Sequence, residues 1–347
     1  MVFGRNLRCG LFNNFEGITM STITSHTVTV TAREQAELVP SEFSTDVGEG
    51  EIAGRTLASL VSAGTELNSA YLGKNFPSTP GYSAVIEVEQ VGAKVDGFKP
   101  GDLAFCMSGH RSHHKVQAKQ ALPVPDGLSP EVGTFARMMC VSMTTLNTTA
   151  ARPPARVLVC GLGLVGHLAA KNFQASGYEV FTCDPVDSRR RLASETGVQN
   201  VMDSAPLDDE SLAGTFLLAL ECSGHEQALL DAARVIRKRG EVVCIATPWR
   251  RFTDLLMHDL HHAIFHNYAV IRSGWEWELP HHSEPFRSGS IFENLAGALR
   301  WLESGRVSVE GIYSKYSPND AQQAYQDLLH KKTDRLAVVF DWASFHG

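Results

Sequence analysis

A glycine-rich turn in the second half of the chain has the spacing expected of a phosphate-binding loop. Residues 161–166 read Gly-Leu-Gly-Leu-Val-Gly and directly follow the apolar run 157–160, which predicts a buried strand. In such a turn the first glycine permits a tight bend, the second lets the backbone approach a pyrophosphate, and the third allows close packing of helix on strand. Free N–H groups at the start of the next helix complete the anion site. We expect a dinucleotide to bind along Gly161, Gly163, Leu164, Val165 and Gly166.

An acidic residue after the next predicted strand bears on which dinucleotide binds. Asp184 directly follows residues 179–183, close to where a carboxylate takes the hydroxyls of the adenosine ribose. That carboxylate would repel a 2′-phosphate, which favours NAD over NADP. Arg189, in the basic run 189–191, supports the alternative, because an arginine turned toward the ribose can hold such a phosphate. The sequence favours NAD and leaves NADP open.

Two more strand ends are expected at the same edge of the sheet. Ser223 follows the predicted strand 216–221, and Thr247 follows the predicted strand 240–246. Because ligands bind outside the carboxyl ends of the strands in such sheets, we expect Ser223 and Thr247 to line the cofactor site.

These candidate residues require two kinds of scaffold. From residue 27 to about residue 122, short alternating strands broken by Gly and Pro predict a β-rich, barrel-like module. Residues 131–148 then read as a helix, with Ser129 available as its cap. From residue 156 the pattern alternates between strand and helix, with one helix over 226–238, and predicts a doubly wound parallel sheet. The expected fold class is α/β.

The end of the chain is expected to return to the first module. Residues 291–304 and 319–331 read as helices and residues 336–340 as a strand, which are too few to fold alone. The predicted organisation is a disordered tail at 1–24, a β-rich domain from 25–150 and 290–347, and a dinucleotide-binding domain at 151–289.

Composition excludes several classes of partner. The 347 residues carry 31 Lys and Arg against 38 Asp and Glu, a net charge of −7, which argues against binding nucleic acid or an anionic membrane. No apolar stretch approaches the roughly 20 residues needed to span a bilayer. Seven scattered cysteines without a CxxC pair indicate reduced thiols in a cytoplasmic protein. Residues 1–19 lack the apolar core of a secretory signal, and Met20 is an alternative start.

Several further motifs occur in an order that resembles the medium-chain dehydrogenase/reductase superfamily over nearly the whole chain. The matching strings are SAGTE at 62–66, PGYSA at 80–84, FKPGD at 98–102, LPVPDGL at 122–128 and the turn at 161–166. The first two are most similar to the branch that includes bacteriochlorophyllide hydroxyethyl dehydrogenase. The resemblance implies a GroES-like catalytic domain, a Rossmann cofactor domain and a homodimer.

The resemblance also implies a member without zinc. Ala63 stands where zinc-dependent relatives carry a Cys ligand, and Gly81-Tyr82-Ser83 replaces their Gly-His-Glu. Cys140 alone still matches a ligand position, and a catalytic zinc ordinarily needs three protein ligands. The region 101–119 contains only Cys106, so the four-cysteine structural zinc lobe is missing as well.

Some other group must then stabilise the charge that hydride transfer builds on a carbonyl oxygen. Tyr82 occupies the lost His position and is the first candidate, although a tyrosine also commonly fills an apolar cleft. Thr65 stands where relatives carry a proton-relay hydroxyl, and Glu66 is either its orienting group or a solvated carboxylate. His110 is the next candidate acid or base. Strand alternation points Ser112 and His114 the same way as His110.

Two other clusters are less specific. His258, His262 and His266 share one face of a predicted helix, and we interpret them as structural or interfacial rather than metal-binding. Trp275, Trp277 and the pair 281–282 follow the last predicted strand of the sheet. They would wall a pocket for a ring-shaped or sugar-like substrate, or belong to the core and a dimer surface.

Together the sequence predicts an NAD(P)-dependent, zinc-independent oxidoreductase that interconverts a secondary alcohol and a ketone, with a small molecule bound between the domains. Reduction of an activated carbon–carbon double bond is one alternative. A non-catalytic dinucleotide-binding protein is the other.

Overall fold

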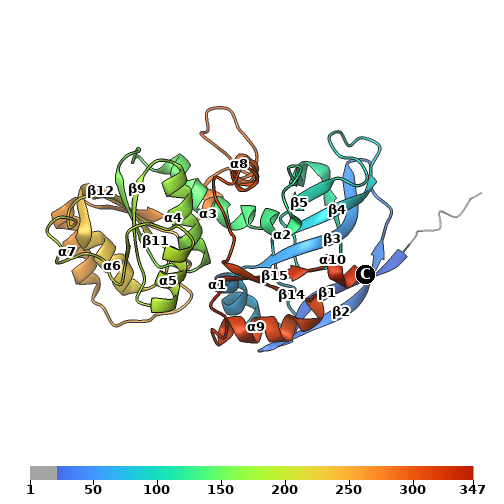
Figure 1. The fold of residues 1–347 in the computed structure, drawn as a ribbon, viewed down its shortest axis with the longest axis horizontal. Helices are drawn as coiled ribbons and strands as arrows, with labels where there is room; N and C mark the ends of the chain where they lie inside the picture. The colour runs from blue at the N-terminus through green and yellow to red at the C-terminus, as the bar shows by residue number, and fades with distance from the viewer. Residues whose placement is uncertain (1–21, 347) are drawn as a thin grey trace, which may run out of the picture.

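The computed structural model describes residues 22–346, which form two lobes joined at the middle of the molecule (Figure 1). Most of the predicted tail, including Met20, lies outside the described residues. Residues 22–24 do not belong to a tail, because they begin strand β1 (Thr22–Ala32), which pairs with β2 (Gln35–Ser44) in an antiparallel hairpin. The sequence analysis missed β2. Half of its residues are polar, only Ala36 is buried and Pro40 interrupts the run, so it lacks the sustained apolar alternation that marks a strand.

Both ends of the chain contribute to the sheet of the first lobe, as expected. Strand β15 pairs antiparallel with β3, with Val338 opposite Val61. Within the described residues this sheet has seven strands, in the order β14 (Tyr313–Tyr316), β15 (Ala337–Asp341), β3 (Glu51–Val61), β4 (Ala84–Val91), β5 (Leu103–Cys106) and β7 (Ala121–Pro123), with β6 (His113–Gln117) paired to β3.

The second lobe is the predicted doubly wound parallel sheet, in which every strand pair of the described residues is parallel. Its order is β10 (Val201–Met202), β9 (Glu179–Cys183), β8 (Arg156–Cys160), β11 (Phe216–Glu221), β12 (Ile236–Cys244) and β13 (Val270–Ser273). The helices around it are α4 (Leu164–Ala175), α5 (Asp187–Glu195), α6 (Glu226–Val235) and α7 (Met257–Asn267). The α/β class is confirmed.

Two predicted helices have different bounds. Helix α6 ends at Val235 rather than at residue 238, because the chain then extends so that Ile236 pairs with Phe216 of the neighbouring strand. The helix expected over 131–148 is two helices, α2 (Pro130–Gly133) and α3 (Ala136–Thr148). Ser129 caps α2 as predicted, accepting a hydrogen bond from the backbone N–H of Val132.

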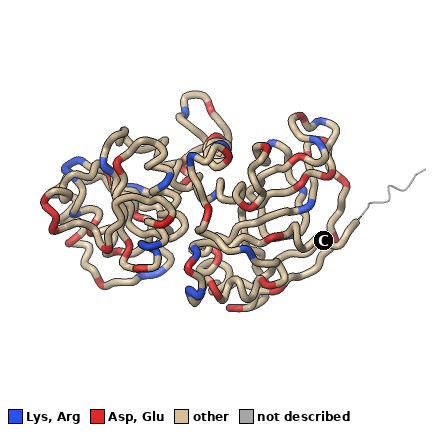
Figure 2. Tube along the Cα trace, in the orientation of Figure 1, with Lys and Arg blue, Asp and Glu red and all other residues tan. Residues whose placement is uncertain are grey.

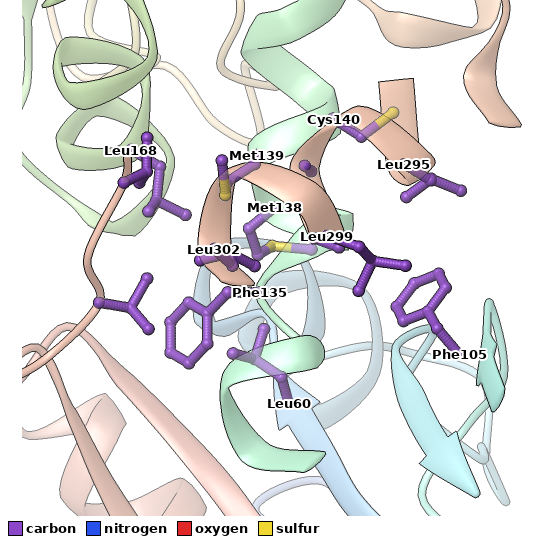
Figure 3. Packing of buried hydrophobic residues seen from close by; sticks show 14 of the residues in the cluster. Leu60, Phe105, Phe135, Met138, Met139, Cys140, Leu168, Leu295, Leu299 and Leu302 are labelled. Atoms are coloured by element: carbon purple, nitrogen blue, oxygen red, sulfur yellow. The ribbon is translucent and has the colours of Figure 1, made fainter. Parts of the chain in front are cut away.

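One apolar core extends through both lobes and is centred on α3 and α8 (Ile291–Glu303) (Figure 3). Met138, Met139 and Cys140 of α3 pack between the two lobes. The remaining labelled members come from the first sheet, the α2–α3 junction, α4 and α8: Leu60, Phe105, Phe135, Leu168, Leu295, Leu299 and Leu302. Because these side chains form a single cluster, the two lobes are held in a fixed relative position.

Lys and Arg positions are interspersed with Asp and Glu positions along the chain in both lobes (Figure 2). No helix among residues 22–346 is long and apolar enough to cross a membrane. The cysteines of the described residues are free thiols, at positions 106, 140, 160, 183, 222 and 244.

Candidate active site

The carboxyl ends of the parallel strands border a cavity of about 470 Å³ between the lobes. From the second lobe its lining includes the turn after β8, the start of α4, and Ser223 and Thr247 from the predicted strand ends. From the first lobe it includes Thr65, at α1 (Ala63–Glu66), and Tyr82. The predicted cofactor residues that line it are Gly161, Gly163, Leu164, Val165, Arg189, Ser223 and Thr247.

The three glycines of the turn have the three geometries that a dinucleotide requires. Gly161 has φ +96°, and a Cβ there would lie 2.9 Å from the Cβ of Ser223. A Cβ on Gly166 would lie 1.8 Å from the carbonyl oxygen of Gly161, so α4 can pack on the strand only with glycine at this position. A Cβ on Gly163 would meet no atom within 4 Å, which leaves the start of α4 open to a ligand. The residues present therefore fit a pyrophosphate at the free N–H groups of this helix.

Glu221, at the end of β11, holds the loop that carries Ser223. Its carboxylate accepts hydrogen bonds from the backbone N–H groups of Ser223 at 2.7 Å and Gly224 at 3.0 Å, and from the Ser223 hydroxyl at 2.5 Å. Burial raises the pKa of this carboxyl, and the hydrogen bonds from Ser223 oppose that shift. Glu221 thereby fixes a cavity-lining loop without lining the cavity itself.

Asp184 is buried behind the cofactor cavity. Its carboxylate accepts hydrogen bonds from the backbone N–H groups of Leu162 at 2.7 Å and Val186 at 2.8 Å, and Arg189 lies 3.4 Å away. Arg189 lines the cavity, whereas Asp184 does not. Asp184 thus braces the glycine turn and holds Arg189 at the cavity wall. Of the neighbouring arginines, Arg191 pairs with Asp187.

A larger cavity of about 1010 Å³ adjoins the first. Trp275, Trp277 and His281 line it, as the sequence analysis proposed for a substrate pocket, and Met107 and Phe292 add apolar wall. Arg137 and Glu276 are the only Lys, Arg, Asp or Glu side chains of the described residues in its lining.

Tyr82 and Thr65 line both cavities and so mark the place where they meet. Burial raises the pKa of the Tyr82 hydroxyl, while hydrogen bonds with Ser62 and Thr65 lower it by less. The hydroxyl therefore stays protonated through the neutral range and can donate a proton.

His110 and Glu66 lie together elsewhere, in a buried network that lines neither cavity. His110 Nε2 is 3.0 Å from Glu66 Oε2, and Nδ1 is 2.8 Å from the Ser59 hydroxyl. The Tyr325 hydroxyl donates to the same Glu66 oxygen at 2.7 Å. The backbone N–H of Ser62 donates to the other oxygen at 2.8 Å. Glu66 is only 2% exposed, so the expectation of a solvated carboxylate is wrong.

The expected alternation of the segment after His110 is confirmed, but its histidines do not enter the cleft. His110, Ser112 and His114 are buried and Arg111 and His113 are less so. The hydrogen bond from His114 Nδ1 goes to Ser108, and burial lowers the pKa of His114 to about 3. His110 and Ser112 precede β6 and His114 lies in it, and all three side chains are buried within the first lobe rather than in the cavities.

The residues at the positions that the resemblance aligns with zinc ligands do not fit a catalytic zinc. Ala63 offers no ligand atom, Tyr82 is a protonated phenol, and the Cys140 thiol points to the carbonyl oxygen of Ile291 at 3.8 Å. Within the described residues, no group of three or more His, Cys, Asp or Glu side chains could hold a metal ion. The exposed histidines of α7 therefore form no such group, although the His262 and His266 ring centroids lie 4.1 Å apart in a tilted arrangement.

Sequence reasoning missed Arg137, which meets Glu276 at the larger cavity, although Glu276 lies in the segment 275–278 that was expected to wall a substrate pocket. The Arg137 Nη2 atom lies 2.5 Å from Glu276 Oε1, and both residues are buried. The available signal was a single arginine in the otherwise uncharged helix 136–148.

Comparison with known proteins agrees with this geometry. Residues 161–276 match a family model described as zinc-binding dehydrogenase. The chain is 23% identical over 308 residues to alcohol dehydrogenase notN of Aspergillus sp. (strain MF297-2), covering 77% of this chain and 83% of that protein. It is 25% identical over 245 residues to an alcohol dehydrogenase of Geobacillus stearothermophilus. That match covers 58% of this chain and 72% of that protein. These matches support the medium-chain dehydrogenase/reductase superfamily.

Solved structures show that the fold shared with other dehydrogenases extends over nearly the whole chain. Galactitol-1-phosphate dehydrogenase from Escherichia coli superposes with a TM-score of 0.76 at 18% identity, covering 91% of this chain and 99% of that one. A putative zinc-binding dehydrogenase from Sinorhizobium meliloti 1021 bound to NADP superposes with a TM-score of 0.73 at 15% identity. The superposition covers 92% of this chain and 99% of that one. Acetophenone reductase from Geotrichum candidum NBRC 4597 in complex with NAD superposes with a TM-score of 0.71 at 16% identity. The superposition covers 92% of this chain and 97% of that one.

The glycine turn yields a stability prediction. Gly166→Ala should lower the free energy of unfolding by about 2–3 kcal/mol, because its Cβ would overlap the Gly161 carbonyl oxygen. Gly163→Ala, which meets open space, should change it by less than about 0.5 kcal/mol. Urea unfolding followed by circular dichroism measures both, and equal losses in the two variants would contradict the assigned geometry.

Proposed function

We propose that the chain is a nicotinamide-dinucleotide-dependent oxidoreductase that interconverts a secondary alcohol and a ketone without a catalytic zinc. The observation that carries this proposal is that Tyr82 and Thr65 line both the dinucleotide-type cavity and the larger, mostly apolar one. A small molecule in the larger cavity would meet the dinucleotide beside these two hydroxyl groups. The dehydrogenase relatives support the same reaction class.

Tyr82 supplies the charge stabilisation that zinc supplies in other members. A bound nicotinamide ring supplies or accepts the hydride. As negative charge builds on the substrate oxygen, the buried Tyr82 hydroxyl donates its proton there, and it takes a proton back in the oxidation direction. Its raised pKa keeps the phenol protonated at neutral pH, which is the form that carbonyl reduction needs.

We assign to Thr65 and Ser62 a supporting role, because their side chains lie near enough to the Tyr82 hydroxyl to oppose the rise of its pKa on burial. We assign to Glu66 and His110 a positioning role rather than a catalytic one. Glu66 accepts a hydrogen bond from the Ser62 backbone at the start of α1, and His110 packs on Gly81, where a Cβ would lie 2.7 Å from the ring.

The role of Tyr82 predicts the effect of removing its hydroxyl. Tyr82→Phe should lower the rate of carbonyl reduction about 10²–10⁴-fold, because the developing alkoxide loses its proton donor. The dissociation constant of the dinucleotide should stay within about twofold. The measurement is reduced-cofactor consumption on a panel of ring-bearing ketones, with calorimetry for cofactor binding.

Tyr178→Phe is the matched control, because that hydroxyl bonds to the Ala151 carbonyl away from the cavities. An unchanged rate in Tyr82→Phe would remove Tyr82 from the mechanism. Turnover of enones without any turnover of alcohols or ketones would instead favour double-bond reduction. Tight dinucleotide binding with no turnover on either panel would favour the non-catalytic alternative.

We propose NAD as the preferred cofactor, with Asp184 as the residue that disfavours a 2′-phosphate. Asp184→Ala should lower the ratio of NAD to NADP affinity at least about tenfold, since it removes negative charge beside Arg189 and frees that guanidinium. Titration calorimetry with both oxidised cofactors measures the ratio. Arg191→Ala serves as control, because Arg191 pairs with Asp187 on the exposed side of α5. An unchanged ratio in Asp184→Ala would show that another residue sets the preference.

We also propose that the chain forms a homodimer through β13, the edge strand of the parallel sheet. Phe265, Tyr268 and Val270 expose 74%, 65% and 55% of their surface beside this edge, which is a large apolar patch for a monomer. Light scattering should give twice the chain mass. Val270→Lys should reduce the measured mass to that of a single chain. Ile23→Lys on β1, the control, should leave the measured mass unchanged. A single-chain mass for the unmodified protein would contradict the dimer.

A further inference from the structure

Arg137 places a buried cation in the wall of the larger cavity. It lies in the first turn of α3, and only 4% of its surface is exposed. Its guanidinium carbon lies 5.0 Å from the Tyr82 ring centroid and 5.6 Å from that of Trp277. These two rings flank the guanidinium and hold its position next to the proton donor of the proposed reaction.

Most of the hydrogen-bonding capacity of Arg137 is unused. Its Nη2 donates to Glu276 Oε1 at 2.5 Å, whereas its Nε and Nη1 atoms are buried and have no hydrogen-bond partner within residues 22–346. A guanidinium carries five N–H donors, and leaving a buried charged donor without a hydrogen-bond partner is destabilising. An oxygen atom of a ligand in the cavity that Arg137 lines would recover that free energy.

The charge of the pair decides which oxygen fits. Glu276 already neutralises Arg137, and no other Lys, Arg, Asp or Glu of the described residues lines this cavity. A carboxylate bound to Arg137 would bring a second negative charge close to Glu276 in mostly apolar surroundings, without a second cation to balance it. A carbonyl or hydroxyl oxygen accepts the same hydrogen bonds and adds no charge.

We infer that Arg137 is a substrate-binding residue that donates to a neutral carbonyl or hydroxyl oxygen, and that Glu276 excludes carboxylates from the cavity. The substrate class is then a neutral, ring-bearing alcohol or ketone whose oxygen lies within reach of both Tyr82 and Arg137. This assignment rests on the proposed function, because it treats the larger cavity as the substrate site.

Two probes of nearly equal shape test the inference without turnover. The probes are 4-tert-butylbenzamide and 4-tert-butylbenzoate, titrated by calorimetry into the full chain without cofactor and again with NAD. The unmodified protein should bind the amide at least tenfold more tightly than the carboxylate. Glu276→Gln should strengthen carboxylate binding at least tenfold and remove the preference, because Arg137 then keeps an unbalanced charge.

The second part of the experiment removes the hydrogen-bond donor, the Arg137 guanidinium. Arg137→Met alone would leave Glu276 buried without a partner, so the double variant Arg137→Met, Glu276→Gln is the variant to use. It should bind the amide at least tenfold more weakly than the Glu276→Gln protein. Arg306→Met is the matched control, because Arg306 also stacks on a tryptophan, Trp301, but lines neither cavity, and it should leave both affinities unchanged.

Three results would overturn the inference: carboxylate binding as tight as amide binding in the unmodified protein, equal amide affinity with and without Arg137, or no binding of either probe. Failure of the proposed function looks different. Amide binding that depends on Arg137, without oxidation or reduction of any alcohol or ketone, would support Arg137 as a binding residue for a neutral oxygen. The same result would contradict the proposed oxidoreductase activity.

Discussion

The shared apolar core around α3 and α8 is the constraint on which the rest of the structure depends. Met138 and Met139 pack against side chains of both lobes, so neither lobe completes its interior without the other. The same helix carries Arg137 at its start, on the side of the cavity. A close-packed core transmits small shifts, so the separation of Tyr82 from the glycine turn is set by this packing.

The site is built from a small number of polar groups in mostly apolar walls. Between the two cavities the chain has a phenol whose pKa is raised by burial, and the larger cavity also contains a guanidinium from α3. Both groups donate hydrogen bonds, and neither depends on a metal to do so. Glu276 balances the guanidinium, which keeps a buried cation compatible with folding.

The local motifs were accessible from sequence because their chemistry depends on backbone geometry. The glycine spacing identified the turn, and Tyr82 and Thr65 were found through the strings around them. The surroundings of Glu66, His110 and Asp184 could not be predicted, because sequence does not reveal that Tyr325, Ser59 and Leu162 contribute hydrogen bonds to them from distant segments. Arg137 was missed for a related reason, since its partner Glu276 is 139 residues away.

The ion pair between Arg137 and Glu276 also bears on motion. Arg137 lies in α3, before the first strand of the second lobe, and Glu276 follows the last strand of that lobe's sheet. Their ion pair therefore joins the two stretches of chain that lead into and out of the second lobe. A rotation that widened the cleft would pull the two charges apart while both are still shielded from water. Electrostatic attraction between the two buried charges therefore opposes such a rotation, in addition to the packing of the shared apolar core.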